Sequence, residues 1–271
     1  MEKLYLTERQ DIIGPHENRS KFAEILVGYG AAQARTPDHP WQQVGTWILI
    51  GMTGRWQRTL ALWEWANGWD GFSDMIVSTM ISPPRELAGV YEGVDRLRSG
   101  GECYLLAPGP HCPTLADLVA AGVQGSLLVY ERADVEPGTE EGYLEAVHAE
   151  WEPVATGHGY SLVGHYVAAK ADGIVFTAWA AERAGHTGLA RAPQACRWRA
   201  TRRRLVRGWQ EELWLAAPGS RLAGPRRRPG SDRVPVAEAT ARLRSAGGRC
   251  RRSRLPRRRS SASRCPGLAN V

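Results

Sequence analysis

The chain has 271 residues, 43% of them hydrophobic, and a formal net charge of +7 at pH 7. This composition is typical of a globular protein, and no apolar run approaches the roughly 18–20 residues that a membrane-spanning helix needs. The five cysteines form no CxxC pair and their spacing is irregular, which argues against a disulfide scaffold. Because a strand pattern begins almost at the first residue, we expect no signal peptide and a cytoplasmic location.

The charge is distributed unevenly along the chain. Residues 225–271 contain 14 Arg, no Lys and two acidic residues, a net charge of +12, so residues 1–224 carry −5. We expect residues 221–271, which are rich in Arg, Pro, Ser and Gly, to form a disordered tail. Three interpretations of this tail stay open: an arm for nucleic acid or an anionic surface, a disordered extension, or an out-of-frame product of GC-rich DNA.

The predicted elements follow the order strand, helix, strand, strand, helix, strand, and this order occurs twice. In the first unit we expect strands near 4–13, 43–52, 57–66 and 102–107, and helices near 18–34, 71–79 and 85–97. In the second we expect strands near 125–134, 160–169, 173–180 and 212–217, and helices near 139–156 and 194–211. Between the units lies a linker, 111–123, with a short helix near 114–121. Each unit has the order of a ferredoxin-like domain, an antiparallel sheet with helices on one face.

The two units also share short sequence patterns in the same order. Glu8-Arg9 corresponds to Glu131-Arg132, Val44–Trp47 to Val163–Tyr166, Trp63 to Trp179, and 102–109 to 212–219. The separation falls gradually, from 123 residues at Glu8 to 110 at Gly109, which indicates a tandem duplication with small deletions. We therefore predict an α+β fold in which two ferredoxin-like βαββαβ repeats, 1–110 and 124–220, pack their sheets together as an α/β barrel.

Side chains alternate between the two faces of a strand, so each strand can be assigned an outer and an inner face. We expect the purely aliphatic set of each first strand to lie under the helices, and the aromatic and polar set to lie between the sheets. The ligand-binding residues predicted for this inter-sheet cavity are Tyr5, Arg9, Trp47, Trp63, Tyr130, Arg132, Tyr166 and Trp179. Aromatic walls suit an aromatic ligand, and Arg suits a planar anion. The alternative is an aromatic core whose arginines either reach out to solvent or pair with Glu8 and Glu131.

Candidate catalytic residues are few. His165 lies on a predicted core strand, while Glu64 and Asp70 flank the tryptophan-rich third strand and could act as general bases. A buried, hydrogen-bonded histidine and surface carboxylates are the alternatives. The histidines show no HxH or HExxH spacing, and no phosphate-binding glycine loop opens a helix, so we expect neither a metal nor a nucleotide site.

The paired Glu-Arg, the Val-Gly-x-aromatic starts of the second strands and the third-strand tryptophans resemble the NIPSNAP-type branch of the dimeric α/β-barrel superfamily. The resemblance covers about residues 1–220 and implies no shared catalytic motif. The wider superfamily contains cofactor-free monooxygenases, cyclases, isomerases, haem enzymes and proteins without known activity.

The resemblance therefore implies a small-molecule enzyme of secondary metabolism or aromatic catabolism, monooxygenase-like or isomerase/cyclase-like, without a bound organic cofactor. Its substrate would be an aromatic or anionic metabolite in the inter-sheet cavity, and a homo-oligomer is compatible with the superfamily. The alternatives are a non-catalytic ligand-binding or scaffold protein, and a nucleic-acid-associated protein that binds nonspecifically through its basic tail. Fold alone does not decide among them.

Overall fold

The computed structural model describes residues 3–36, 39–83 and 85–224. The expected tail lies outside the described residues from position 225 onward. Its first four residues belong to the folded body instead, because Leu222 is buried and its carbonyl accepts a hydrogen bond from the Gly125 N–H at 3.0 Å. The boundary expected at residue 220 is therefore too early by about four residues.

The elements of the first half are β1 (Leu4–Ile12), α1 (Asn18–Gln33), β2 (Trp41–Leu49), β3 (Arg58–Trp65), α2 (Gly68–Ile76), the π-helical turn η1 (Val77–Ile81), α3 (Arg85–Asp95) and β4 (Arg98–Pro108). The short helix α4 (Leu115–Ala120) lies in the predicted linker. The second half contains β5 (Leu127–Val135), α5 (Glu140–Ala146), η2 (Val147–Trp151), α6 (Glu152–Thr156), β6 (Ser161–Ala168), β7 (Ile174–Ala181), α7 (Arg183–Arg191), α8 (Pro193–Leu205) and β8 (Val206–Ala216). The predicted order of strands and helices is confirmed in both halves.

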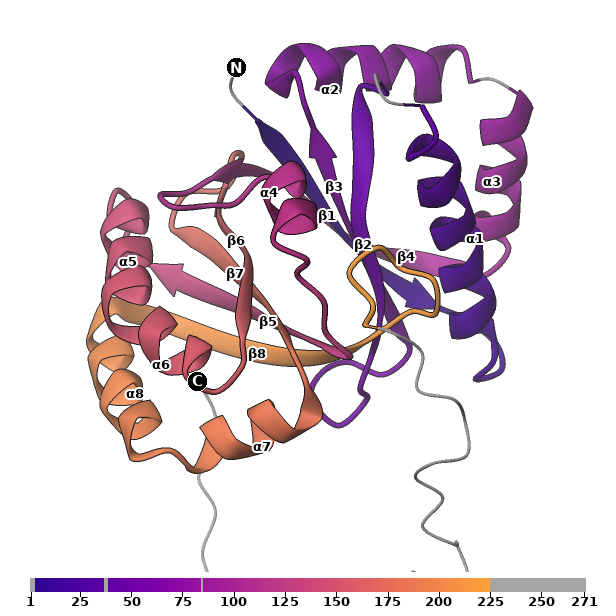
Figure 1. The fold of residues 1–271 in the computed structure, drawn as a ribbon. Helices are drawn as coiled ribbons and strands as arrows, with labels where there is room; N and C mark the ends of the chain where they lie inside the picture. The colour runs from indigo at the N-terminus through magenta and orange to yellow at the C-terminus, as the bar shows by residue number, and fades with distance from the viewer. Residues whose placement is uncertain (1–2, 37–38, 84, 225–271) are drawn as a thin grey trace, which may run out of the picture. The chain divides into compact units, whose positions relative to one another are not determined.

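The eight strands form one closed antiparallel barrel in the order β1-β3-β2-β8-β5-β7-β6-β4. The two four-stranded halves join where β2 pairs with β8 and where β4 pairs with β6. Figure 1 shows α1 and α3 outside the first half and α5, α6 and α8 outside the second. The fold is thus an α+β barrel with an apolar interior and a helical outer layer.

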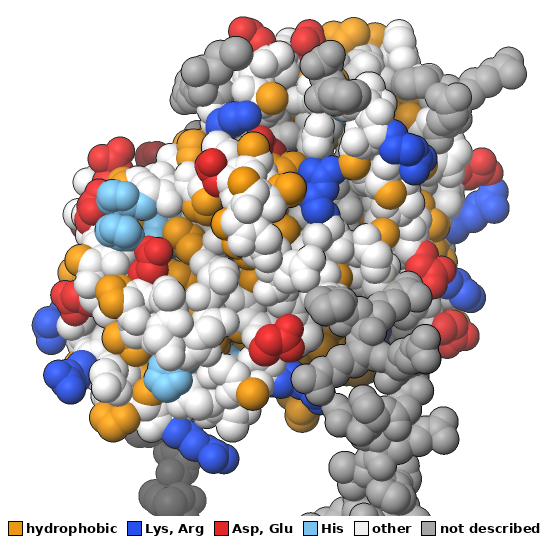
Figure 2. All heavy atoms as spheres, viewed as in Figure 1, with side chains coloured by type: hydrophobic (Ala, Val, Ile, Leu, Met, Phe, Trp, Pro, Cys, Tyr) orange, Lys and Arg blue, Asp and Glu red, His pale blue; other side chains and the backbone are white. Residues whose placement is uncertain are grey.

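Three buried clusters follow from this arrangement. One fills the barrel interior, and each of the other two lies between the outer face of one half and its helices. Within the part of the chain that the structure describes, no helix is both long and apolar enough to cross a membrane. Acidic and basic side chains are interspersed over the face that Figure 2 shows.

The two halves repeat several local details. The ladder between the second and third strands is shifted between Gln43 and Gly45 in the first half, and between Leu162 and Gly164 in the second. A Cβ atom at either glycine would collide with the aromatic ring two residues further along the strand. Glycine is needed there because the ring folds back over the backbone.

The predicted faces are correct for the first strands and wrong for the third strands. Trp63 lies opposite Leu6, and Trp179 lies opposite Val129. Because directly opposed residues of an antiparallel pair point to the same face, both tryptophans must share the aliphatic, helix-covered face. The prediction that these tryptophans face the interior is therefore wrong, because a register error of one residue moves every side chain of a strand to the opposite face.

Two other details differ from the expectations. The helix expected at 194–211 ends at Leu205, because β8 pairs with β5 from Val206 onward, and α7 was not predicted. In the last strands, Leu106 lies opposite Tyr5 and Trp214 lies opposite Leu128. Leu106 and Trp214 are therefore the equivalent residues of the two halves, and they are 108 residues apart in the sequence rather than the expected 110.

Candidate functional site

The predicted inter-sheet cavity is a packed core. Tyr5, Trp47, Tyr130 and Tyr166 do face the barrel interior, where the Tyr5 and Tyr166 rings lie 5.0 Å apart. The interior cluster also contains side chains that were not expected there, namely Val44, Leu60, Leu62, Leu106, Phe176 and Trp214. These side chains occupy the space that a ligand would need, and each of the four predicted aromatic residues is at most 2% exposed.

Both predicted arginines form ion pairs within the protein. Arg9 is buried and pairs with Glu212, with 3.4 Å between Nη1 and Oε2, and with Glu102. Arg132 is half-buried, and its Nη2 lies 2.9 Å from Oδ1 of Asp134. Their partners are not Glu8 and Glu131, as the core alternative expected, but the guanidinium groups are engaged in both halves.

The three predicted catalytic residues lie apart from one another. Glu64 is 7% exposed and accepts hydrogen bonds from Tyr5 Oη at 2.9 Å and the Leu115 N–H at 2.7 Å, so it fixes α4 to the end of the barrel. His165 is fully buried beneath Trp179, and burial lowers its pKa to about 4, which leaves it neutral at pH 7. Asp70 is exposed in the first turn of α2.

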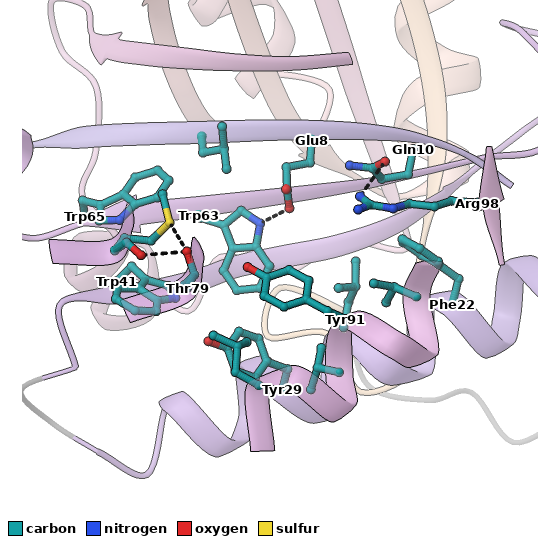
Figure 3. Close-up of a pocket in the computed structure, with 16 residues that line it drawn as sticks. Glu8, Gln10, Phe22, Tyr29, Trp41, Trp63, Trp65, Thr79, Tyr91 and Arg98 are labelled. Carbon is teal, nitrogen blue, oxygen red and sulfur yellow. Dashed lines mark hydrogen bonds between the residues drawn. The ribbon is translucent and has the colours of Figure 1, made fainter. Parts of the chain in front are cut away.

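A cavity of about 100 Å³ lies on the other side of the first half, between the outer face of its sheet and α1, α2 and α3 (Figure 3). Its walls are mostly apolar, half of that apolar lining being aromatic, with the polar groups of Glu8, Gln10 and Arg98 toward one end. The aromatic residues that line it are Phe22, Tyr29, Trp41, Trp63, Trp65 and Tyr91. An apolar enclosure with a few convergent polar groups is the usual form of a small-molecule site.

Glu8 is the central polar group of this cavity. Its Oε2 accepts a hydrogen bond from the indole Nε1 of Trp63 at 2.8 Å, and Oε1 has no donor among the described residues. Glu8 keeps some accessible surface because it borders the cavity, yet protein atoms surround it closely. Desolvation therefore raises its pKa, opposed by the Trp63 hydrogen bond and the charge of Arg98. A carboxylate in this state is a stronger base than an ordinary glutamate.

The guanidinium of Arg98 lies at the same end of the cavity. Its Nη1 donates to Oε1 of Gln10 at 3.2 Å, and its Nη2 lies 2.7 Å from Oδ1 of Asp95. Figure 3 shows Gln10 and Arg98 beside Glu8. A negative charge that formed near Glu8 would therefore be close to a cation held in place by two partners.

The second half contains the same carboxyl–tryptophan pair in a closed setting. Oε2 of Glu131 accepts from Trp179 Nε1 at 3.2 Å and from Thr177 Oγ1 at 2.6 Å, and its Oε1 lies 3.8 Å from Nη1 of Arg202. In the first half Ala61 stands opposite Glu8 where Thr177 stands opposite Glu131. The space beneath the second-half helices is occupied by Tyr143, Trp151 and Trp198, all buried.

Glu8 therefore has one hydrogen-bond donor, whereas Glu131 has three neighbouring partners. Glu8 also borders a cavity, whereas Glu131 borders packed side chains. This difference marks the first half as the open site. Sequence reasoning aligned Glu8 with Glu131 but assigned them only a pairing role. One sequence feature indicates this site: in both halves a glutamate falls on the otherwise aliphatic face of the first strand, which the helices cover.

The described residues contain no group of three His, Cys, Asp or Glu side chains arranged to hold a metal ion. The residues that line the cavity offer proton transfer by the desolvated carboxyl group of Glu8, an aromatic surface to hold a flat ligand, and a cation to stabilise negative charge.

The sequence matches no protein-family model and no curated protein. Solved structures similar to this chain in fold include the following three. A Lactobacillus acidophilus NCFM protein that is provisionally named a monooxygenase has a TM-score of 0.56 and 10% identity, covering 83% of this chain and 100% of its own. A Fusobacterium nucleatum subsp. nucleatum ATCC 25586 protein, also provisionally named a monooxygenase, has a TM-score of 0.54 and 9% identity, covering 80% and 93%.

The third structure is of a protein named anthrone oxidase-like, with a TM-score of 0.51 and 14% identity, covering 83% of this chain and 95% of its own. At these identities the similarity shows the fold alone. The chain thus shares an α+β fold with these three proteins, and in this chain the eight antiparallel strands of one polypeptide close the barrel.

Proposed function

We propose that the protein is a monooxygenase-like enzyme that oxidises a small aromatic metabolite with dioxygen, and that Glu8 is its general base. The observation that carries this proposal is the contrast between the twin carboxyl groups. Glu8 is desolvated, has one hydrogen-bond donor and borders an aromatic cavity, whereas Glu131 is enclosed by partners. The names of the similar structures agree with this class of activity.

The proposed reaction begins when Oε1 of Glu8 removes a proton from an acidic O–H or C–H group of the substrate. The resulting anion is stabilised by the charge of Arg98 and by delocalisation over the ring, which lies against the aromatic walls. The electron-rich carbon then forms a bond to dioxygen, giving a hydroperoxide after protonation. Loss of water from the hydroperoxide leaves a carbonyl group, so a phenol and one dioxygen give a quinone and one water.

The volume of the cavity limits the substrate. An apolar cavity of roughly 150 Å³ binds benzene, and this cavity has about 100 Å³. The cavity in this conformation is therefore smaller than a benzene site, so we propose a substrate of a single aromatic ring, whose entry would require the lining side chains to move. A three-ring substrate, as the name of the anthrone oxidase-like structure implies for that protein, would require the helices to move apart.

The proposal places the chain in the NIPSNAP-like branch and derives it from a tandem duplication. Support for the duplication comes from the repeated strand–helix order, the ladder shifts at Gly45 and Gly164, and the hydrogen bonds from Trp63 to Glu8 and from Trp179 to Glu131. In this account one copy keeps the site, and the other has filled its cavity.

The test is dioxygen consumption with a panel of monocyclic phenols and with anthrone, comparing the wild type with Glu8→Gln. We expect turnover of at least one monocyclic phenol, and a loss of kcat/KM of about 10²–10⁴-fold in Glu8→Gln, the usual contribution of a general base. Glu211→Gln is the matched control, because it replaces another glutamate with a raised pKa, in the half without the cavity.

Binding of a phenol, followed by tryptophan fluorescence, separates the competing functions. Binding that depends on the cavity but gives no dioxygen consumption would support the non-catalytic ligand-binding alternative. If Glu8→Gln turned over phenols as fast as the wild type, Glu8 would not be the base and the proposed mechanism would be wrong.

A further inference from the structure

A second hollow lies at one end of the barrel and is not used by the proposed reaction. It is a cleft of about 850 Å³, within the roughly 300–1,000 Å³ of common small-molecule sites. Segments from across the body converge on it: the start of β1, the segment before β2, the end of β3, α4 and the residues after β8. The polar residues that line it are Lys3, His39, Gln42, Glu64, Asn67 and Arg221.

Arg221 is the unusual group of this cleft. It is half-buried, and its Nη1 donates to Oε1 of the neutral Gln42 at 3.1 Å. Within the described residues no carboxylate lies at ion-pair distance from its guanidinium, in contrast to Arg9, Arg58 and Arg132. Desolvation lowers the pKa of Arg221, opposed by the charge of Glu64, which lines the same cleft but lies beyond ion-pair distance. A partly buried cation in this state favours an anionic ligand.

The acidic groups near the cleft are already engaged. Glu64 accepts hydrogen bonds from Tyr5, from the Leu115 N–H and from Lys3 Nζ, the last at 3.2 Å. Asp117, on α4, closes the capping box with Thr114. The carboxylates therefore hold the walls in place, and the guanidinium of Arg221 keeps donors that are free to bind a further acceptor.

One wall of the cleft is apolar. Helix α4 contributes Ala116, Val119 and Ala120, all exposed, and Val119 is 56% exposed. On the opposite face of α4, Leu115 and Leu118 are buried in the barrel interior, which anchors the helix. The cleft thus combines a fixed apolar surface with a desolvated cation.

We propose that this cleft binds a carboxylate with an apolar body, with the carboxylate on Arg221 and the body along the exposed side of α4. The planar fork of the guanidinium matches a carboxylate, and the length of α4 suits a short alkyl or aryl chain. The site is separate from the cavity of Glu8, which lies on the helix-covered outer face of the first half.

The test is calorimetric titration of the full-length protein with octanoate and with octanol, which has the same chain length and no charge. We expect octanoate to bind, octanol to bind at least tenfold more weakly, and Arg221→Gln to weaken octanoate at least tenfold. Arg207→Gln is the matched control, because Arg207 is an exposed arginine of the second half. Val119→Asp should weaken octanoate without removing Arg221.

Octanoate binding that is unchanged in Arg221→Gln, or equal binding of octanol, would overturn the proposal, as would the absence of octanoate binding. If Arg221→Gln melts at a lower temperature than the wild type, Arg221→Lys serves as the second variant, because lysine keeps the charge but lacks the planar fork. Arg221→Lys should then bind octanoate more weakly than the wild type. Glu8→Gln should bind octanoate as the wild type does, so this result is independent of the phenol experiments.

Discussion

The twin carboxyl groups allow a specific perturbation of Glu8. Ala61→Thr places a hydroxyl opposite Glu8, as Thr177 already does for Glu131 in the second half. A hydrogen bond to a charged group contributes about 1.5–3 kcal/mol. Since one pKa unit corresponds to about 1.4 kcal/mol, the pKa of Glu8 should fall by about one to two units.

The lower pKa has two measurable consequences. A glutamate whose pKa is raised in the folded state binds its proton more tightly there, so its contribution to stability is greatest below the unfolded pKa. That contribution is lost as the pH rises through the folded pKa. In Ala61→Thr this loss should become smaller, and phenol oxidation should slow because Glu8 is a weaker base.

The assay is a carbon-13 NMR titration of the glutamate carboxyl groups, with the Glu8 signal assigned by its absence in Glu8→Gln. Ala61→Val is the matched control, because valine has the shape of threonine without the hydroxyl. Both substitutions add volume at a buried position, which costs about 1–3 kcal/mol. The reasoning fails if the pKa of Glu8 moves equally in both variants, or in neither.

Three further outcomes are expected. Burial raises the pKa of Glu211 to about 7, so the free energy of unfolding of the wild type should fall as the pH rises from about 4.5 through 7. In Glu211→Gln, urea unfolding should show a fall that is smaller by up to about 1–3 kcal/mol across that range. A chain that ends at residue 224 should have the same melting temperature as the full protein. A chain that ends at residue 220 lacks the buried Leu222, whose burial contributes about 1.5–3 kcal/mol to the free energy of unfolding, and should melt several degrees lower. Val90→Phe should fill the cavity and weaken phenol binding at least tenfold, while octanoate binding stays unchanged; unaltered phenol binding would place the ligand elsewhere.

Local patterns were sufficient to predict the order of the elements. The glycines and prolines that end strands and helices, and the repeated Val-Gly-x-aromatic segments, predicted both βαββαβ series. Only α7 was missed, because Arg183–Arg191 is a polar segment in which Leu189 is the one buried residue. The helix expected to reach residue 211 ended at Leu205 because pairing between β8 and β5 determined the boundary.

The site was harder to predict because its position depends on strand register. Trp63 and Trp179 look like residues of a ligand cavity, and each donates a hydrogen bond to a glutamate, but they face the helices. A register error of one residue changes which side of the sheet is aromatic, and the register is determined by pairing between strands, such as that of β3 with β1 and of β7 with β5. The cavity itself depends on how large side chains such as Trp151 and Trp198 fill one half, which local sequence patterns do not encode.

The central claim is that ligand binds beneath the helices of the first half, beside Glu8. The most direct measurement is a crystal structure of the protein with 4-bromophenol, in which the anomalous signal of bromine locates the ligand. The account predicts a single strong bromine peak in the cavity between Trp63 and Tyr91, with the phenol oxygen within hydrogen-bond distance of Glu8. A bromine peak in the barrel interior, or beside Glu131 in the second half, would contradict it.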